Sequence, residues 1–370
     1  MNAFKPYPLR DDFTLKNRLV MAPMTTYSSQ DDFHVSEEEL HYYKLRSKTM
    51  GMVIIAATSI NDQAQAFDKQ ITLKSDDYIP SMARLAKAIK EEGAKAIVQL
   101  HHGGRMNNPT LYENKEDIVS ASAVPAPREG MVTPRALTEE EIHQTIEDFA
   151  QATRRSIEAG YDGVELHGAN TYLLQQFFSP HSNRRTDAFG GSLTKRMHFI
   201  DMLIDRVNEV IKHDATEPFI LGYRFSPEEI EDPGITLNDT LALVDMLKDK
   251  PLDYLHISLG KYDQSSMRDQ TDQEPIAQKI QTVLKRKIPF IGVGKIETRE
   301  SIDHALSLGY DLVASGMPIL VDPNWGETIQ LNQPIKTVMP DTLPKPLYDR
   351  LAKYRERFQQ SGYEFPVEND

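Results

Sequence analysis

The chain has 370 residues, with 55 acidic and 42 basic side chains and a formal net charge of −13 at pH 7. This balance disfavours nucleic acid and anionic membranes as partners, because both attract basic surfaces. The absence of cysteine excludes disulfides, thiolate nucleophiles and cysteine-ligated iron–sulfur clusters. No segment approaches the roughly 20 apolar residues that span a bilayer, and residues 1–13 lack the apolar core of a signal peptide, so we expect a cytoplasmic protein without a membrane partner.

Short apolar segments alternate with longer helical patterns along the chain. The expected strands are 18–23, 52–58, 96–100, 163–167, 219–225, 254–259, 289–293 and 312–315. Apolar residues near a 3.6-residue spacing predict helices over 81–92, 139–159, 193–212, 237–248, 276–286 and 299–307. Apolar strands that are each followed by a helix indicate a parallel sheet, and eight such units predict an α/β fold, the TIM (β/α)8 barrel. A doubly wound open sheet is the alternative, but the first strand lacks the glycine-rich fingerprint typical of that fold.

Two segments are expected to decorate the barrel. Residues 4–17 are typical of a hairpin that closes the barrel floor, and residues 344–360 of a helix that docks on the barrel. We therefore divide the chain into a barrel domain, 1–335, and a helical extension, 336–370. The connections 101–138 and 168–191 exceed the usual loop length, which favours a lid or substrate channel over a surface insertion.

The most informative stretch follows the fourth strand, where His167, Asn170 and Tyr172 stand within six positions. A neutral imidazole and a carboxamide donate hydrogen bonds without net charge, and such a pair suits an oxygen that becomes negative during a reaction. A tyrosine beside them can supply a proton. The alternative is a polar strand end that only caps a loop, but three donors followed by the Gly190–Gly191 turn disfavour it.

The segment 163–196 resembles the Old Yellow Enzyme family of flavin-dependent ene-reductases, and the resemblance extends over roughly residues 5–330. It implies that His167 and Asn170 bind the carbonyl oxygen of an α,β-unsaturated substrate, while Tyr172 protonates the α-carbon. The segment 179–192 would brace the loop that carries them.

The resemblance also implies a slot for a flavin. Pro23, Met24 and Thr25 would contact the C4/N5 region. Ala57 would let the ring lie flat, and Gln99 would contact the pyrimidine edge. Arg224 would place its charge at N1/O2, with a structural salt bridge as the alternative role.

The phosphate is expected near the last two strands, where Gly294, Ser315 and Gly316 offer backbone amides. The family usually has arginine after the glycine of the eighth strand, whereas this chain has Met317. Backbone amides alone, or another cation such as Lys295, would then bind the phosphate.

Two further features are ambiguous. Tyr27 would contact substrate over the flavin or simply pack into its loop. The pair His101–His102 has no third ligand at metal-binding spacing, so we expect no metal.

The resemblance therefore implies an enzyme with noncovalent FMN and NAD(P)H as reductant, acting on unsaturated carbonyl, quinone or nitro compounds by hydride transfer from flavin N5 and proton transfer from Tyr172. A flavin-binding redox sensor or storage protein without turnover is the alternative. A cofactor-free barrel aldolase or isomerase is another, and the dienoyl-CoA reductase group is excluded by the lack of cysteine. The sequence leaves open the substrate, the choice of NADH or NADPH and the oligomeric state, a homo-oligomer included.

Overall fold

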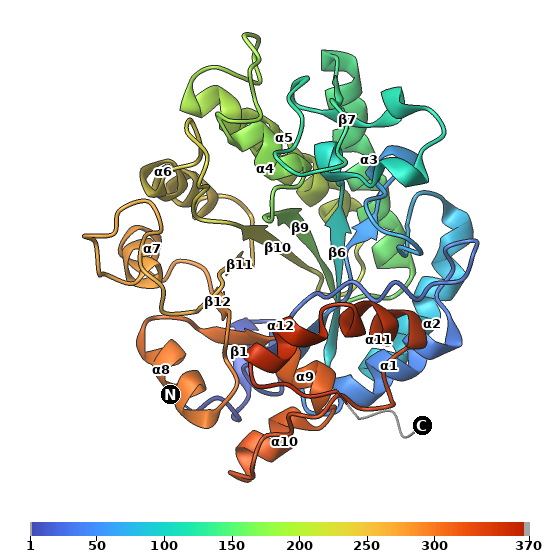
Figure 1. Cartoon of the computed structure of the whole chain (residues 1–370), viewed down its shortest axis with the longest axis vertical. Coiled ribbons are helices and arrows are strands. Elements are labelled where there is room, and N and C mark those ends of the chain that lie inside the picture. The colour runs from blue at the N-terminus through green and yellow to red at the C-terminus, as the bar shows by residue number, and fades with distance from the viewer. Residues whose placement is uncertain (1, 366–370) are drawn as a thin grey trace.

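A computed structural model of the chain describes residues 2–365 and contains a closed barrel of eight parallel strands (Figure 1). The barrel strands are β3 (Leu19–Met21), β4 (Met52–Ile54), β6 (Lys95–His101), β9 (Gly163–Gly168), β10 (Ile220–Phe225), β11 (Tyr254–Ile257), β12 (Phe290–Val293) and β13 (Leu312–Ser315). Closure comes from the parallel pairing of β13 with β3 and of β4 with β6. The predicted TIM barrel is confirmed, and each expected strand overlaps an observed one.

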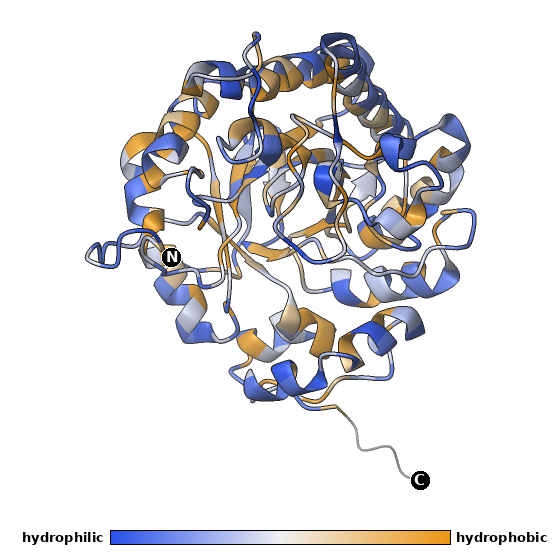
Figure 2. Ribbon diagram, turned by 45° about the horizontal axis from the view of Figure 1, so that its top comes forward, coloured by the Kyte–Doolittle hydropathy of each residue, from blue (hydrophilic) through white to orange (hydrophobic). Residues whose placement is uncertain are grey.

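Helices surround the barrel, and Figure 2 shows them with apolar residues facing inward and polar residues facing out. The long helices are α1 (Glu37–Ser47), α2 (Ile79–Lys90), α3 (Glu139–Glu158), α5 (Leu193–Asp214), α6 (Leu237–Leu247), α7 (Ile276–Leu284) and α8 (Arg299–Ser307). Their bounds agree with the predicted ones to within two residues, except that the body of α1 was not predicted. Helix α7 ends before its predicted terminus because Lys285 and Arg286 take positive φ values of 52° and 56°, which break the helical repeat.

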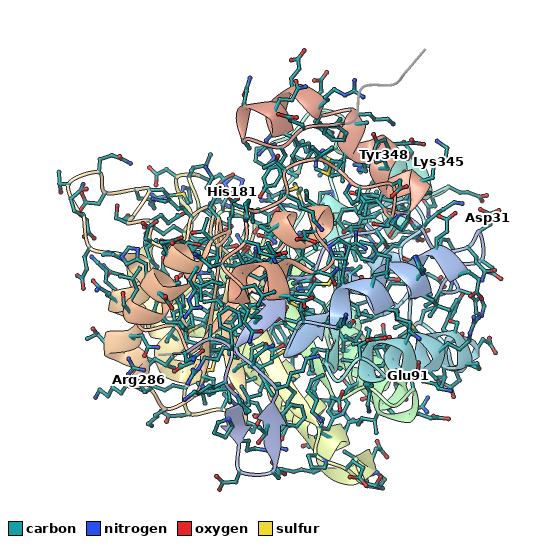
Figure 3. The ribbon with its side chains drawn as sticks, turned by 90° about the horizontal axis from the view of Figure 1, so that it is seen from below. Asp31, Glu91, His181, Arg286, Lys345 and Tyr348 are labelled. Atoms are coloured by element: carbon teal, nitrogen blue, oxygen red, sulfur yellow. The ribbon has the colours of Figure 1, made fainter. Side chains whose placement is uncertain are left out.

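The N-terminal hairpin, β1 (Tyr7–Arg10) paired antiparallel with β2 (Phe13–Leu15), closes one end of the barrel. Its buried Leu9, Phe13 and Leu15 share an apolar cluster with Ile97 and Ile220, which lie near the starts of their strands. The expected floor is therefore confirmed. In Figure 3 the labelled Lys345 and Tyr348 lie at the other end of the molecule from this hairpin, which is the end where the strands finish.

The C-terminal extension contains two helices rather than the single helix predicted over 344–360. Helix α11 (Lys345–Ala352) and helix α12 (Arg355–Gln360) are separated at Lys353 and Tyr354, where Tyr354 leaves the helical conformation with φ −113° and ψ 24°. Tyr363 and Phe365 are buried beyond α12. Docking on the barrel is thus observed, whereas the domain boundary at 335 stays a prediction.

Short elements complete the fold, and none was predicted as a separate element. They are β5 (Thr58–Ser59), β7 (Val119–Ser120), β8 (Arg135–Ala136), α4 (Leu173–Phe178), α9 (Met317–Val321), α10 (Trp325–Gln330) and five 3-10 turns, 62–64, 76–78, 104–106, 109–111 and 115–117. Within residues 2–365, the helices are all too short or too polar to cross a membrane.

Candidate active site

A buried polar layer inside the barrel supports the site from below. Inward-facing positions alternate along each strand, and those of β6, β9 and β11 place Gln99, Glu165 and His256 at one level. Gln99 Nε2 and His256 Nδ1 each lie 2.8 Å from a different oxygen of the Glu165 carboxylate. Burial alone would raise the pKa of Glu165, but His256 and Arg224 hold this pKa below its usual value, so the group is ionised.

Arg224, at the end of β10, is in register with His167 of β9 and His256 of β11, and the residue is only 7% exposed. Burial lowers the pKa of this guanidinium, and the Glu165 carboxylate opposes that effect. Its Nη2 donates to Ser258 Oγ at 3.2 Å, and its Nε is buried without a hydrogen-bond partner in the described part of the chain. Among residues 2–365, Arg224 makes no ion pair within 4.0 Å, which disfavours the structural salt bridge considered as its alternative role.

His167, near the end of β9, is a neutral hydrogen-bond donor. Its Nδ1 accepts from the Ala169 amide at 3.3 Å, which leaves the proton of the neutral ring on Nε2. Burial, with the nearby His101 and Arg224, holds the pKa of His167 well below its ordinary value. The imidazole can therefore donate a hydrogen bond without carrying charge.

Asn170 presents its NH2 group beside that ring. Its Oδ1 accepts from Ser258 Oγ at 2.8 Å, so the amide nitrogen is left as the free donor. The backbone is strained at this point, because Asn170 and Thr171 have φ values of 56° and 69°. Ser226 Oγ accepts from the Asn170 amide at 2.9 Å, and Gln175 Oε1 accepts from the Thr171 amide at 2.9 Å, which holds the strained pair in place.

Tyr172 follows the strained pair as the N-cap residue, immediately before helix α4. Its ring centroid lies 4.4 Å from that of His101 and 5.0 Å from that of His167, both approached edge to face. Burial raises the pKa of Tyr172 above its ordinary value, which keeps the hydroxyl protonated at neutral pH. The geometry therefore brings two uncharged donors and one protonated hydroxyl together.

One cavity collects most of the residues predicted from the sequence. It is lined by Pro23, Thr25, Ala57, Phe67, Gln99, His167, Asn170, Tyr172 and Arg224. Only Phe67 of this set was not predicted, because it lies in an irregular loop far from any strand end.

A second cavity, of about 460 Å³, lies at the ends of β12 and β13 and contains the predicted phosphate residues Gly294, Lys295, Ser315 and Gly316. Met24 connects the two regions, since a Cβ on Gly316 would approach its sulfur to 3.1 Å. Gly294 has φ +111°, and a Cβ there would come within 2.6 Å of the Leu259 carbonyl oxygen, so this close approach requires glycine.

A third cavity, of about 370 Å³, opens beside Tyr172 and contains Tyr27. Met106, Arg128 and Met131 of the long 101–138 connection also line it, which agrees with the expected channel. Tyr27 packs edge to face on Phe67 at 5.8 Å, and Arg350 stacks on its ring at 4.2 Å.

The segment expected to brace the catalytic loop does so through its side chains. Asn183 Nδ2 donates to the carbonyl oxygens of Phe177 and Phe189 at 2.6 and 2.7 Å. Ser182 Oγ donates to the Gln176 carbonyl at 2.9 Å.

The donor set fits a flavin. A buried arginine with an unpartnered Nε, a primary amide and a threonine hydroxyl line one slot, and this is the chemistry that a pyrimidine edge requires. In the described part of the chain, His, Asp and Glu side chains nowhere gather as three or more potential metal ligands.

Sequence reasoning did not assign a role to Glu165, His256 or His101. The available signal was the alternation of polar residues within the strands GVELH and YLHI, where every second residue faces the interior.

Comparison with known proteins agrees with this geometry. Residues 2–336 match the model of the NADH:flavin oxidoreductase / NADH oxidase family. The chain is 42% identical to the probable NADH-dependent flavin oxidoreductase YqiG of Bacillus subtilis, over 94% of this chain and 95% of that protein. It is also 44% identical to the NADH:acrylate oxidoreductase of Vibrio harveyi over 84% of this chain, but spans only 31% of that longer protein. An old yellow enzyme homologue of known structure, from Zymomonas mobilis, superposes with a TM-score of 0.79 at 25% identity, covering 93% of this chain and 99% of the other.

Fold, site and relatives together define an NAD(P)H-dependent flavin oxidoreductase that uses FMN. The chain belongs to the NADH:flavin oxidoreductase / NADH oxidase family, the Old Yellow Enzyme family that its sequence resembles.

Proposed function

We propose that this enzyme reduces the activated C=C bond of α,β-unsaturated carbonyl compounds. The observation that carries the proposal is the meeting of His167, Asn170 and Tyr172 in the cavity that also contains the flavin-type residues. Bound FMN would supply the hydride for the β-carbon, after its own reduction by NAD(P)H.

His167 and Asn170 bind the substrate oxygen in this proposal. Negative charge develops on that oxygen as the β-carbon accepts hydride, and fixed donors stabilise it. Because His167 is neutral, it favours the developing enolate without holding a ground-state anion as strongly as an imidazolium would. Ser258 Oγ donates to the side-chain oxygen of Asn170 and accepts from Arg224. One hydroxyl therefore fixes the position of Asn170, which binds the substrate oxygen, relative to Arg224, which binds the flavin.

Tyr172 donates the proton to the α-carbon. Its hydroxyl keeps its proton at neutral pH because burial raises its pKa, and it lies at the wall shared by the flavin cavity and the cavity of Tyr27. A substrate that enters past Tyr27 therefore meets the proton donor as it reaches His167.

The remaining predicted residues hold the cofactor in this proposal. The Pro23–Thr25 segment and Ala57 shape the slot, and Gln99 and Arg224 address the pyrimidine edge. Gly294, Lys295, Ser315 and Gly316 lie where the phosphate would bind. The names of two longer relatives support the reaction class, since one is an NADH:acrylate and the other an NADH:fumarate oxidoreductase, and this chain spans 31% and 38% of their lengths.

Replacing Tyr172 by phenylalanine tests the proton-transfer step. We expect flavin reduction by NAD(P)H to proceed at nearly the parental rate, and enone reduction to slow by about 10²–10⁴-fold, the usual contribution of a general acid. Quinones accept hydride without protonation at an α-carbon, so their turnover should be retained. Stopped-flow absorbance of each half-reaction gives both rates.

Quinone turnover by the same variant is the internal control for an intact, FMN-loaded site. An enone half-reaction as fast in Tyr172→Phe as in the parent would remove Tyr172 from the mechanism.

A further inference from the structure

The cavity at the ends of β12 and β13 has one wall that comes from the far C-terminus. Tyr354, Arg357, Phe358, Ser361 and Tyr363 line it, opposite residues 293–297 and 314–318. Figure 1 shows α12 lying over the barrel next to α9, the helix that follows β13. The C-terminal segment therefore helps to form the cavity that holds the predicted phosphate residues.

This wall is held by buried side chains and by backbone pairing, and its Tyr363 and Phe365 join the main apolar core. The backbone of Glu364 pairs with Thr337 and Met339, accepting from Met339 N at 2.9 Å and donating to Thr337 O at 2.8 Å. Tyr363 is buried and lines the cavity together with Glu297 of the loop after β12, and burial together with that carboxylate raises its pKa. Arg357 is thus carried on a segment that is held by residues 337–339 and that packs against the loop after β12.

The cavity contains two cations whose charges are not used elsewhere in the described structure. Within residues 2–365, neither the Arg357 guanidinium nor the Lys295 ammonium makes a hydrogen bond or an ion pair, and Glu297 is the one carboxylate of the lining. Two cations against one carboxylate leave a net positive cavity, which suits a phosphate dianion.

The side chain after Gly316 explains why a cation would come from elsewhere. Met317, which also lines the cavity, is uncharged and cannot bind phosphate through its side chain. An arginine is preferred at such sites because its planar fork matches two phosphate oxygens.

We propose that Arg357 of α12 binds the FMN phosphate, supplying from the C-terminal extension the guanidinium that position 317 lacks. Lys295 then acts beside it as a second, point-like charge. The inference concerns cofactor binding alone, so it does not depend on which acceptor the enzyme reduces.

The test compares FMN with riboflavin, which has the same ring and ribityl chain but no phosphate. Apoprotein of the parent, Arg357→Ala, Arg357→Lys and the control Lys353→Ala is titrated with each ligand and followed by quenching of flavin fluorescence. Lys353 is an exposed cation of the same extension that does not line the cavity, so its removal controls for net charge.

We expect Arg357→Ala to weaken FMN binding by about tenfold to a hundredfold, the equivalent of one charge-assisted hydrogen bond, and to leave riboflavin binding within about twofold of the parent. Arg357→Lys should retain part of the FMN preference, and Lys353→Ala should match the parent. Adding Met317→Arg to Arg357→Ala should restore FMN binding.

Equal losses for FMN and riboflavin in Arg357→Ala would mean that Arg357 only shapes the wall, and this would overturn the inference. Parental affinity of Arg357→Ala for both ligands would overturn it as well. A parent chain that binds neither flavin would instead contradict the cofactor assignment, so the two failures are distinguishable.

Discussion

At the residue scale, the site places charged and uncharged groups side by side. Glu165 and Arg224 carry opposite charges within the barrel, while the groups assigned to the substrate, His167 and Asn170, are uncharged. The cause is burial, which disfavours the imidazolium of His167 when two other positive or potentially positive groups, His101 and Arg224, lie nearby. This arrangement leaves the oxygen site able to respond to charge that appears only during the reaction.

The double variant His167→Ala, Asn170→Ala tests the oxygen site directly. Phenols whose oxygen mimics an enolate should bind the FMN-loaded parent, and the variant should lose about tenfold or more in affinity, because two donors to a charged oxygen are removed. Titration calorimetry measures the binding.

The single variant Asn170→Ala keeps His167 and its Nε2 proton. Its phenol affinity should therefore lie between that of the parent and that of the double variant. Parental phenol affinity in the double variant, with FMN still bound, would contradict the assignment of these residues to the substrate oxygen.

At the element scale, helix α1 is coupled to the loop after β3 through a buried carboxyl. Glu39 closes a capping box with Ser36, and its carboxyl also accepts a hydrogen bond from Thr26, the residue after Thr25. Burial raises the pKa of Glu39 to about 7. A raised pKa means that the folded chain binds this proton more tightly than the unfolded chain does.

Glu39 therefore contributes stability that is fully present below the unfolded pKa of 4.5 and is lost as the pH rises through about 7. We expect Glu39→Gln to remove this dependence, so that the variant gains on the order of 3 kcal/mol relative to the parent between pH 4.5 and pH 8. Denaturant unfolding at the two pH values measures it.

Glu38→Gln, which removes an exposed carboxylate from the same turn of α1, is the matched control and should follow the parent. If Glu39→Gln showed the same pH dependence as the parent, the carboxyl would not be titrating in the buried state described here.

The strands and long helices could be predicted from sequence because their signals are local. Apolar runs such as 219–225 and capped helices such as 139–159 bury one continuous face, and neighbouring residues alone reveal that pattern. Short elements such as α4 are different. The chain enters that helix through Asn170 and Thr171, whose positive φ values are held by hydrogen bonds to Ser226 and Gln175. Ser226 lies in the loop after β10, far from α4 in the sequence.

At the scale of the whole molecule, the two ends of the barrel have opposite roles. The hairpin fills the end where the strands begin, and the C-terminal helices lie at the end where they finish (Figure 3). Arg350 of α11 lines a cavity together with Tyr172, one of the residues proposed to be catalytic. Three cavities surround that second end, and Tyr172 borders two of them.

The predicted catalytic and flavin residues meet because parallel strands bring their carboxyl ends to one face, which the sequence order alone implies. The place of residues 345–365 could not be predicted in this way. Arg357 reaches the last two strands, and Arg350 reaches Tyr27, only through tertiary packing between segments far apart in the chain. Docking of the C-terminal segment was therefore predicted, but its contribution of residues to the walls of two cavities was not.

The measurement that tests the central claim most directly is anaerobic turnover of an enone by the FMN-saturated protein. NADH or NADPH is mixed with 2-cyclohexenone, and both nicotinamide oxidation and the saturated ketone are quantified. We predict one ketone formed for each nicotinamide oxidised. Reduction of the bound flavin by both nicotinamides without any saturated ketone would contradict the account, and would favour a flavin-binding protein that does not act on activated alkenes.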